Sequence, residues 1–134
     1  LRKRSWLYLT ELQLLKVVEF FDHLCFFIFV KFKKKATKEE LIDRIVKYSG
    51  LPQELNLPSA PEHFIRYMEE EDRPQVKLDV DYERGMGISI GRLREDTVYD
   101  FKFVGLSHNT VRGAAGGAVE CAELLKARGY IGAK

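Results

Sequence analysis

Cysteine is scarce in this sequence, and its placement argues against two classes of protein. The 134 residues contain two cysteines, Cys25 and Cys121, which lie far apart and do not have the spacing of a metal site. The disulfide framework that supports many small secreted domains is therefore excluded, and we expect a reducing, cytoplasmic setting. Cys25 lies in an aromatic run and Cys121 in the middle of an expected helix, so we predict that both are unreactive core residues.

Long apolar runs and a strong charge imbalance are also missing. No run reaches the roughly 18 apolar residues that a membrane-spanning helix needs, because charged residues interrupt the apolar N-terminal region at Glu11, Lys16, Glu19 and Asp22. Basic residues at positions 2–4 weakly imitate a signal peptide, but no small-residue cleavage site follows them. The net charge of +2 is too small to indicate nucleic acid. We expect no targeting segment, no membrane span and no nucleic-acid partner.

The first part of the chain is expected to contain a strand and a helix. Residues 1–22 have a mixed apolar period that fits a helix and a strand equally well. The aromatic and β-branched run Leu24–Phe32 predicts a buried strand. Thr37 and Glu40 form a capping box that should start a helix, and Gly50 is expected to end it.

The middle of the chain is dominated by turn residues. Residues 51–63 contain three of the four prolines and are expected to form a loop. Phe64–Met68 could be a strand, and Lys77–Asp81 could be a short extended segment. Glu69–Asp72 carries four acidic side chains, which is typical of a solvated turn. The Arg73–Pro74–Gln75 sequence that follows indicates a more specific, partly ordered loop.

Two alternating runs predict a β-hairpin in the last third of the chain. Gly85–Leu93 and Val98–Leu106 both alternate apolar and other residues, and we expect them to pair antiparallel. A helix over Arg112–Arg128 should follow and present its apolar side to the body through Val111, Ala115, Ala118, Val119, Ala122 and Leu125. This order of elements predicts an α+β fold, in which helices lie against one face of a sheet.

Small residues cluster at the start of that helix, from Gly113 to Ala118. A helix start with so few side chains lets an anion or a cofactor approach the backbone, where unpaired N–H groups and the helix dipole attract negative charge. The other interpretation is a helix that packs tightly on a sheet, with Gly and Ala making room. The residues by themselves favour packing.

The residues reveal no complete catalytic set. His23 stands at the start of the expected strand beside Asp22, and a neighbouring carboxylate can orient a histidine, although a structural role is the more frequent one. His63 lies in the proline-rich loop and is expected to be exposed. His108 precedes the final helix and would cap it or pack. The dinucleotide fingerprint G-x-G-x-x-G is absent, and the acidic cluster at 69–72 lacks the spacing of a metal site.

Six motifs, taken together, resemble one enzyme family. They are LPSAP (57–61), EEEDRPQ (69–75), LDVD (78–81), GMGISIGRLRED (85–96), FKFVGLSHNTVRGAAGGAV (101–119) and AELL (122–125). Their order and spacing resemble the C-terminal end of aspartate-semialdehyde dehydrogenases of the archaeal and fungal type, over roughly residues 23–127. The resemblance implies the C-terminal domain of the glyceraldehyde-3-phosphate and aspartate-semialdehyde dehydrogenase superfamily, with a mixed or antiparallel sheet.

The resemblance implies a defined reaction. The family reduces β-aspartyl phosphate to aspartate semialdehyde with NADPH and releases phosphate, a step in the synthesis of lysine, threonine and methionine. In the reverse direction a cysteine attacks the aldehyde, a hydride passes to NADP, and phosphate cleaves the resulting thioester. A histidine acts as general acid and base, and an arginine binds the substrate carboxylate.

The resemblance also implies roles for individual residues. His23 occupies the position of the acid/base histidine. Lys16 occupies that of the carboxylate-binding arginine, and lysine keeps the charge but not the two-pronged geometry. The positions that lie against the cofactor are matched by Asn109, Thr110, Gly113 and Ala114. This chain departs from the family pattern at Asp22 and Val18, where the family has Gly and Pro.

The resemblance finally implies a division of the chain. Residues 1–22 match the family poorly, 23–106 would belong to a catalytic and dimerisation domain, and 107–134 would complete an NADP-binding Rossmann domain that lies upstream with the nucleophilic cysteine and the Gly-rich loop. We expect a C-terminal portion of the enzyme that is homo-oligomeric, as a dimer or a tetramer, and inactive alone. The alternatives are a non-catalytic dimerisation or interaction module and, less favoured, a small nucleotide-binding protein.

Overall fold

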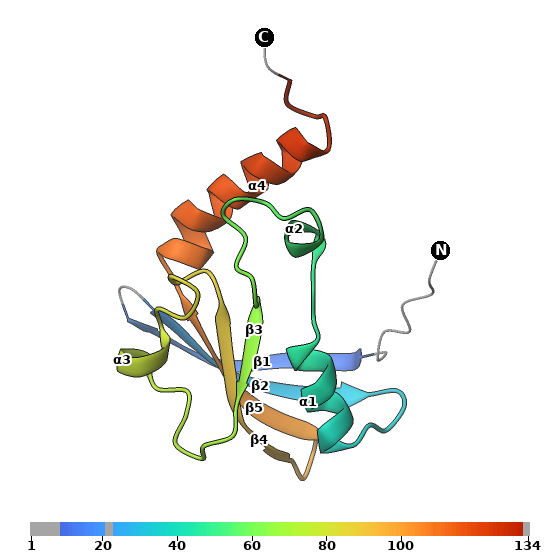
Figure 1. Ribbon diagram of the computed structural model, residues 1–134. Helices are drawn as coiled ribbons and strands as arrows, with labels where there is room; N and C mark the ends of the chain where they lie inside the picture. Colours follow the sequence, from blue (N-terminus) through green and yellow to red (C-terminus); the bar gives the residue numbers. More distant parts are fainter. Residues whose placement is uncertain (1–8, 21–22, 133–134) are drawn as a thin grey trace.

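The protein is built around one mixed five-stranded sheet (Figure 1). The structure is a computed structural model that describes the backbone of residues 9–20 and 23–132 and the side chains of residues 24–132. The strand order is β1-β2-β5-β4-β3, and only the β3–β4 pair is parallel. The strands are β1 (Leu9–Phe20), β2 (His23–Phe32), β3 (Ile65–Met68), β4 (Ile88–Glu95) and β5 (Phe101–His108). The α+β class and the mixed sheet are confirmed.

The strand pairing decides two questions that the sequence left open. Residues 9–20 form a strand, which settles the choice between helix and strand for that part of the N-terminal segment. The predicted hairpin exists, since β4 pairs antiparallel with β5. Its turn is longer than expected, because the Asp96 side chain accepts hydrogen bonds from the backbone of Val98 and Tyr99 and holds these residues out of β5.

Helix α1 (Lys38–Val46) begins at the predicted capping box. Glu40 N donates to Thr37 Oγ1 at 3.2 Å, and Thr37 N donates to Glu40 Oε2 at 3.0 Å. The helix ends at Val46, before Gly50, which instead precedes a single helical turn, α2 (Leu51–Glu54). The prediction of a pure loop over 51–63 was therefore wrong at its start, where the Gln53 side chain accepts from Gly50 N and caps this turn.

The main core lies between α1 and one face of the sheet. Leu41 from the helix packs with Val30, Leu93 and Phe101, each at most 8% exposed. Val30 is the one residue of β2 that is fully buried among residues 24–32, so the expected buried strand is buried on one face only. Side chains alternate along a strand, and those next to Val30 point to the face that α1 does not cover.

Over β3 and β4, that second face of the sheet carries a loop and a short helix. Arg66 and Ser89 are paired across these strands, and their side chains bond there to Asp79 of α3 (Val76–Asp79). The expectation of an extended segment over Lys77–Asp81 was wrong. The Asp79 carboxylate accepts from Gln75 N, which closes a helical turn in place of an extended chain.

The loop at Arg73–Pro74 passes so close to Gly91 that no side chain fits there. A Cβ at Gly91 would lie 2.4 Å from the backbone oxygen of Arg73 and 3.0 Å from Cδ of Pro74. We predict that Gly91→Ala lowers the free energy of unfolding by about 1–3 kcal/mol, because the backbone loop must shift. Chemical denaturation measures this, with Gly132→Ala as the control, since nothing lies within 4 Å there. Equal stability of both variants would contradict the prediction.

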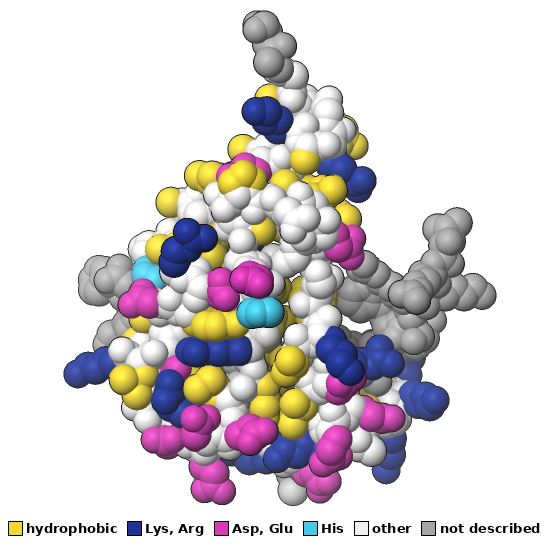
Figure 2. Space-filling model, viewed as in Figure 1, with side chains coloured by type: hydrophobic (Ala, Val, Ile, Leu, Met, Phe, Trp, Pro, Cys, Tyr) yellow, Lys and Arg dark blue, Asp and Glu magenta, His cyan; other side chains and the backbone are white. Residues whose placement is uncertain are grey.

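The C-terminal helix is the element that differs most from expectation. A π-helical turn, η1 (Val111–Ala115), leads into α4 (Gly116–Ala127), which rises away from the sheet in Figure 1. The predicted apolar face is exposed: Val119 is 52% and Leu125 39% accessible, and Figure 2 shows hydrophobic side chains along α4. Apart from the half-buried Val111 at its start, the assignment of this face to the body was wrong.

Polar anchors explain why α4 turns its apolar side outward. Glu120 is 5% exposed and accepts from Arg112 Nη1 at 2.5 Å, while the Arg112 guanidinium lies 4.6 Å above the Phe64 ring. Glu123 accepts from both the backbone and the hydroxyl of Ser59, at 2.9 and 2.8 Å. Because these paired acidic side chains face the body, the side chains of Val119, Ala122 and Leu125 on the other side of the helix are exposed.

Candidate functional site

The candidate site lies where β5 ends and η1 begins. The backbone of His108, the last residue of β5, is paired with that of His23, the first residue of β2. The residues that follow His108 form the turn 108–111, which carries two of the candidate cofactor positions. The sheet register therefore brings the candidate acid/base position and the candidate cofactor segment to the same end of the sheet.

Asn109 and Gly113 are brought together in this turn. Asn109 is half-buried, and a Cβ on Gly113 would lie 3.2 Å from its Oδ1 atom. Thr110 is exposed, with Oγ1 3.3 Å from Nδ1 of His108. Gly113 and Ala114 are exposed as well, so the backbone at the start of η1 is open to an approaching group.

The small residues of this segment differ in their surroundings. Some are needed for close packing, and others leave the backbone accessible, as cofactor binding would require. A Cβ on Gly116 would lie 2.4 Å from Sδ of Met86 and 2.9 Å from the backbone oxygen of Val111, so this glycine serves packing. Gly113, Ala114 and Ala115 are exposed, and a Cβ on Gly113 would meet only the Asn109 side chain closely, with Oδ1 at 3.2 Å. Access to the backbone is therefore confined to the first residues of the segment.

The other histidine and the candidate carboxylate binder lie elsewhere. Lys16 is in β1, and its backbone is paired with Phe27, four residues along β2 from His23. At about 3.3 Å per strand residue this is roughly 13 Å along the strand. His63 is exposed, as predicted.

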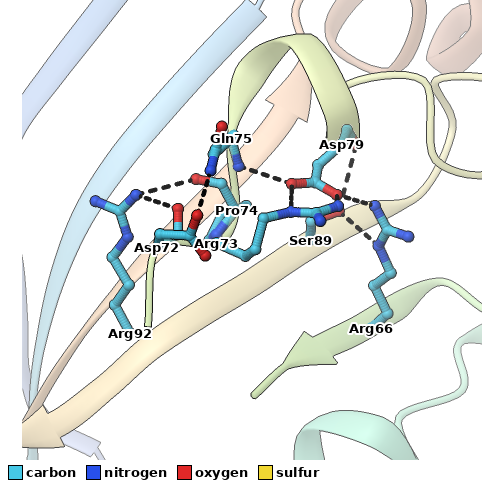
Figure 3. Close-up of polar contacts among 8 residues, drawn as sticks. All are labelled: Arg66, Asp72, Arg73, Pro74, Gln75, Asp79, Ser89 and Arg92. Carbon is cyan, nitrogen blue, oxygen red and sulfur yellow. Dashed lines mark hydrogen bonds and ion pairs between the residues drawn. The ribbon is translucent and has the colours of Figure 1, made fainter. Parts of the chain in front are cut away.

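A second polar cluster surrounds Asp79, on the face of the sheet away from α1 (Figure 3). Asp79 is 1% exposed and accepts from Arg66 Nη2 at 2.6 Å, from Arg73 Nε at 2.7 Å and from Gln75 N at 2.7 Å. Arg73 Nη2 donates to it as well. The hydrogen bonds from Arg73 hold the pKa of the Asp79 carboxyl below its usual range, although burial acts in the opposite direction.

The Asp79 cluster is saturated, which identifies it as a structural feature. Both carboxylate oxygens have donors, and the Arg66 guanidinium also lies 4.2 Å above the Tyr82 ring. Arg92 Nη2 extends the network by donating to the backbone oxygen of Asp72 at 2.7 Å. The partly ordered loop predicted from Arg73–Pro74–Gln75 is confirmed, but no local pattern indicated that Asp79 would hold it.

Cys25 lacks the features of an activated nucleophile. Cys25 is half-buried, and burial raises the pKa of its thiol, with a smaller opposing effect from Arg92. Cys121 is exposed on α4, so its expected place in the core was wrong. Among the described residues no group of three or more His, Cys, Asp or Glu side chains could hold a metal ion, and no helix is long and apolar enough to cross a membrane.

The comparisons with known proteins identify the family. The family model described as "Semialdehyde dehydrogenase, dimerisation domain" matches residues 23–112. The chain belongs to the semialdehyde dehydrogenase family. The match starts at His23 and includes the whole of β2–β5 and the turn that carries Asn109 and Thr110.

Curated relatives share this segment at about two identical residues in five. The aspartate-semialdehyde dehydrogenase of Candida albicans is 44% identical over 93 residues, which is 69% of this chain and 26% of the relative. That of Saccharomyces cerevisiae is 42% identical over 106 residues. The malonyl CoA reductase (NADP) of Metallosphaera sedula is 42% identical over 105 residues. The chain spans only 26–29% of the length of these relatives.

Solved structures share the fold. The crystal structure of the Candida albicans aspartate-semialdehyde dehydrogenase with NADP has a TM-score of 0.73 and 38% identity, and it covers 82% of this chain and 31% of that one. A Vibrio cholerae aspartate-semialdehyde dehydrogenase is similar in fold alone, with a TM-score of 0.63 and 21% identity. This semialdehyde dehydrogenase chain therefore has the expected fold of the C-terminal domain.

Proposed function

We propose that this chain is the C-terminal portion of an NADP-dependent aspartate-semialdehyde dehydrogenase, which reduces β-aspartyl phosphate to aspartate semialdehyde. The observation that carries the proposal is the pairing of His23 with His108, directly before Asn109 and Thr110. A proton donor and a hydride donor must reach the same carbonyl group, the proton at its oxygen and the hydride at its carbon. The sheet register places the candidate residues for both at one end of the sheet.

The described residues fit one side of a nicotinamide cofactor. Gly113 and Ala114 leave exposed backbone, and the absence of a Cβ on Gly113 leaves room for the Asn109 amide beside it. Asn109, Thr110, Gly113 and Ala114 are the residues that would line the cofactor, which supplies the hydride when bound. In this proposal His23 takes a proton from the attacking thiol and gives one to the alkoxide oxygen that forms when a hydride adds to the carbonyl carbon.

The exposed apolar face of α4 is evidence that a further domain packs against this helix. Val119 and Leu125 are 52% and 39% accessible, and Ile131 beyond the helix is 47% accessible. Large apolar side chains that are exposed on one helix indicate an interaction site. In the proposal this face packs against the NADP-binding domain, so that residues 107–134 complete that domain while 23–106 form the catalytic and dimerisation part.

A chimera tests the proposed function. Residues 23–127 of this chain replace the corresponding segment of the Candida albicans enzyme, and NADP reduction is measured with aspartate semialdehyde and phosphate. We expect activity above that of the enzyme without the segment. A folded, dimeric chimera without activity would contradict the proposal and favour the alternative, a dimerisation module that has lost the site.

We expect the 134-residue chain alone not to reduce NADP. Neither of its cysteines occupies the position of the nucleophile, and the sequence holds no Gly-rich phosphate loop. The same assay measures this, and turnover by the isolated chain would show that a different group performs the chemistry.

Self-association of the chain is expected to use the sheet face that α1 leaves uncovered. Phe27 and Phe29 alternate with Ile28 and Val30, which face the core, and they line a groove together with Arg92, Arg94, Lys102, Val104 and Phe103, whose side chain packs on the core. Aromatic rings beside arginine are the composition that protein interfaces favour. These seven residues all lie within the matched dimerisation domain.

Two substitutions of an apolar residue by glutamate locate this interface. We predict that Phe29→Glu converts a homo-oligomer into a monomer, because a charge would be buried between the sheets. Val119→Glu on α4 is the matched control and should leave the oligomer intact. Light scattering coupled to gel filtration measures the mass, and circular dichroism verifies the fold. Dissociation caused by Val119→Glu instead would assign the interface to α4.

A further inference from the structure

The ring of His108 is held in one place at the end of β5. Its side chain is 15% exposed. Gly85, with φ of +78°, passes close beside it, and a Cβ there would lie 3.0 Å from His108 Cδ2 and 3.2 Å from Val111 Cβ. A side chain at residue 85 would therefore be both strained and in collision with the imidazole. The His108 ring therefore lies between Gly85 on one side and the turn 108–111 on the other.

The hydrogen bonds of the ring define its tautomer. The backbone N–H of Val111 points at His108 Nδ1 at 3.4 Å, and an N–H group can only donate. Nδ1 is therefore an acceptor, and the Thr110 hydroxyl at 3.3 Å donates to the same atom. The proton of the neutral imidazole is then on Nε2, which faces Asp81 Oδ1 across 3.9 Å.

This arrangement makes the imidazole the side-chain cap of η1. Thr110, the residue at the cap position, makes no side-chain capping bond to η1. His108 accepts from the first residue of η1 in its place, and the loop that it closes contains Asn109 and Thr110. These two residues are two of the four candidate cofactor positions, and the hydrogen bond to His108 Nδ1 closes the loop that contains them.

We propose that His108 is a positioning residue that holds the cofactor turn in register with the candidate acid/base strand. Its backbone fixes residue 108 opposite His23, and its Nδ1 fixes residues 109–111 on the other side. One side chain thereby sets the position of the turn relative to the strand that begins at His23. The inference rests on the proposed function only where it assigns the turn to a cofactor.

Two substitutions separate a hydrogen-bonding role from a packing role. His108→Leu introduces an apolar side chain of similar size and removes the acceptor. His108→Asn places an oxygen acceptor near the position of Nδ1 but removes the bulk of the ring. Amide hydrogen exchange of Val111 is followed by NMR in the 134-residue chain. We expect exchange about 3- to 10-fold faster in His108→Leu, as for loss of one hydrogen bond, and close to the original rate in His108→Asn.

The reverse order of the two variants, with Leu protecting and Asn exposing the amide, would overturn the proposal and leave a packing role. Exchange of Val104, within β5, verifies that the sheet is intact in both variants, and His63→Leu in the exposed loop is the matched control. The nitrogen chemical shifts of the His108 ring at pH 8 provide a second test, in which a proton on Nδ1 would also overturn the proposal. Neither measurement needs substrate or cofactor, so failure of the proposed function would be distinguishable.

Discussion

Replacing Asp79 by asparagine is expected to lower the free energy of unfolding by about 3–5 kcal/mol, the cost of breaking a buried ion pair from one side. The carboxylate is 1% exposed and is the shared acceptor for Arg66 and Arg73. Asparagine has nearly the same shape as aspartate. The loss of stability therefore measures the lost charge and the lost pairing with donors, and not a change in packing volume. Without the carboxylate, two guanidinium groups on the sheet face lose their counter-charge.

Chemical denaturation at pH 7 measures this loss, and Asp81→Asn is the control two residues away. The Asp81 side chain is 86% exposed, so that substitution should change stability by less than about 0.5 kcal/mol. A cost for Asp79→Asn as small as that of the control would show that the cluster contributes little.

The pH dependence of stability gives an independent test of the same cluster. The folded pKa of Asp79 lies below its unfolded value, because Arg73 donates to the carboxylate. Its stabilisation is therefore complete above the ordinary aspartate pKa of about 3.9 and is lost as the pH falls through the lower folded pKa. We expect a shallower acid slope in Asp79→Asn. The slope should not vanish, since Lys102 and two backbone donors hold the pKa of Asp96 at about 2.

Replacing His23 by glutamine in the chimera is expected to lower kcat by about 10²–10⁴-fold, the usual contribution of a general acid and base. Glutamine can still donate and accept hydrogen bonds but cannot exchange a proton near neutral pH. Binding of substrate and NADP should change less than kcat, because the lost interaction belongs to the proton transfer.

The control for His23→Gln is the same substitution at another histidine, His63. His63→Gln in the exposed loop should leave kcat unchanged. The two variants and the parent chimera are compared for kcat, KM and oligomeric mass under the same conditions. Retention of most of the activity by His23→Gln would remove His23 from the acid/base role and would favour the reading of this chain as a module that lost its site.

Lys16 is the weakest part of the proposed site. Its backbone is paired with Phe27 in the interior of the β1–β2 ladder, while His23 begins β2. The proposal that it binds the substrate carboxylate remains a prediction from the resemblance alone. In the chimera, Lys16 would be outside the transplanted segment, so the assay of residues 23–127 does not depend on it.

Local sequence predicted the elements whose cause is local. The capping box at Thr37 and Glu40 needs only neighbouring residues, and it is present with both hydrogen bonds. The alternation in Gly85–Leu93 and Val98–Leu106 likewise produced a pair of adjacent strands. Motif order in the last part of the chain was sufficient to predict the family.

The errors arose where distant partners decide the structure. The segment around Asp79 becomes helical because its carboxylate meets two arginines and a backbone amide, and Arg66 is thirteen positions away in sequence. The apolar face of α4 was assigned to the core because hydrophobic periodicity shows that a face is apolar, without showing what covers it. Ser59 and Arg112 pair with Glu123 and Glu120, and these ion pairs and hydrogen bonds turn the helix the other way.

The fold class and the family could be predicted from residue order alone, because periodicity, caps and motif order are properties of neighbouring residues. Residue order also supplied both interpretations of the small residues after His108. Tertiary packing places Gly116 against Met86 and leaves Gly113 and Ala114 exposed, and a cofactor against these two residues stays a proposal. The position of His108 opposite His23 was likewise a decision of strand register, since the hydrogen bonds between two strands depend on their mutual alignment and not on either strand alone.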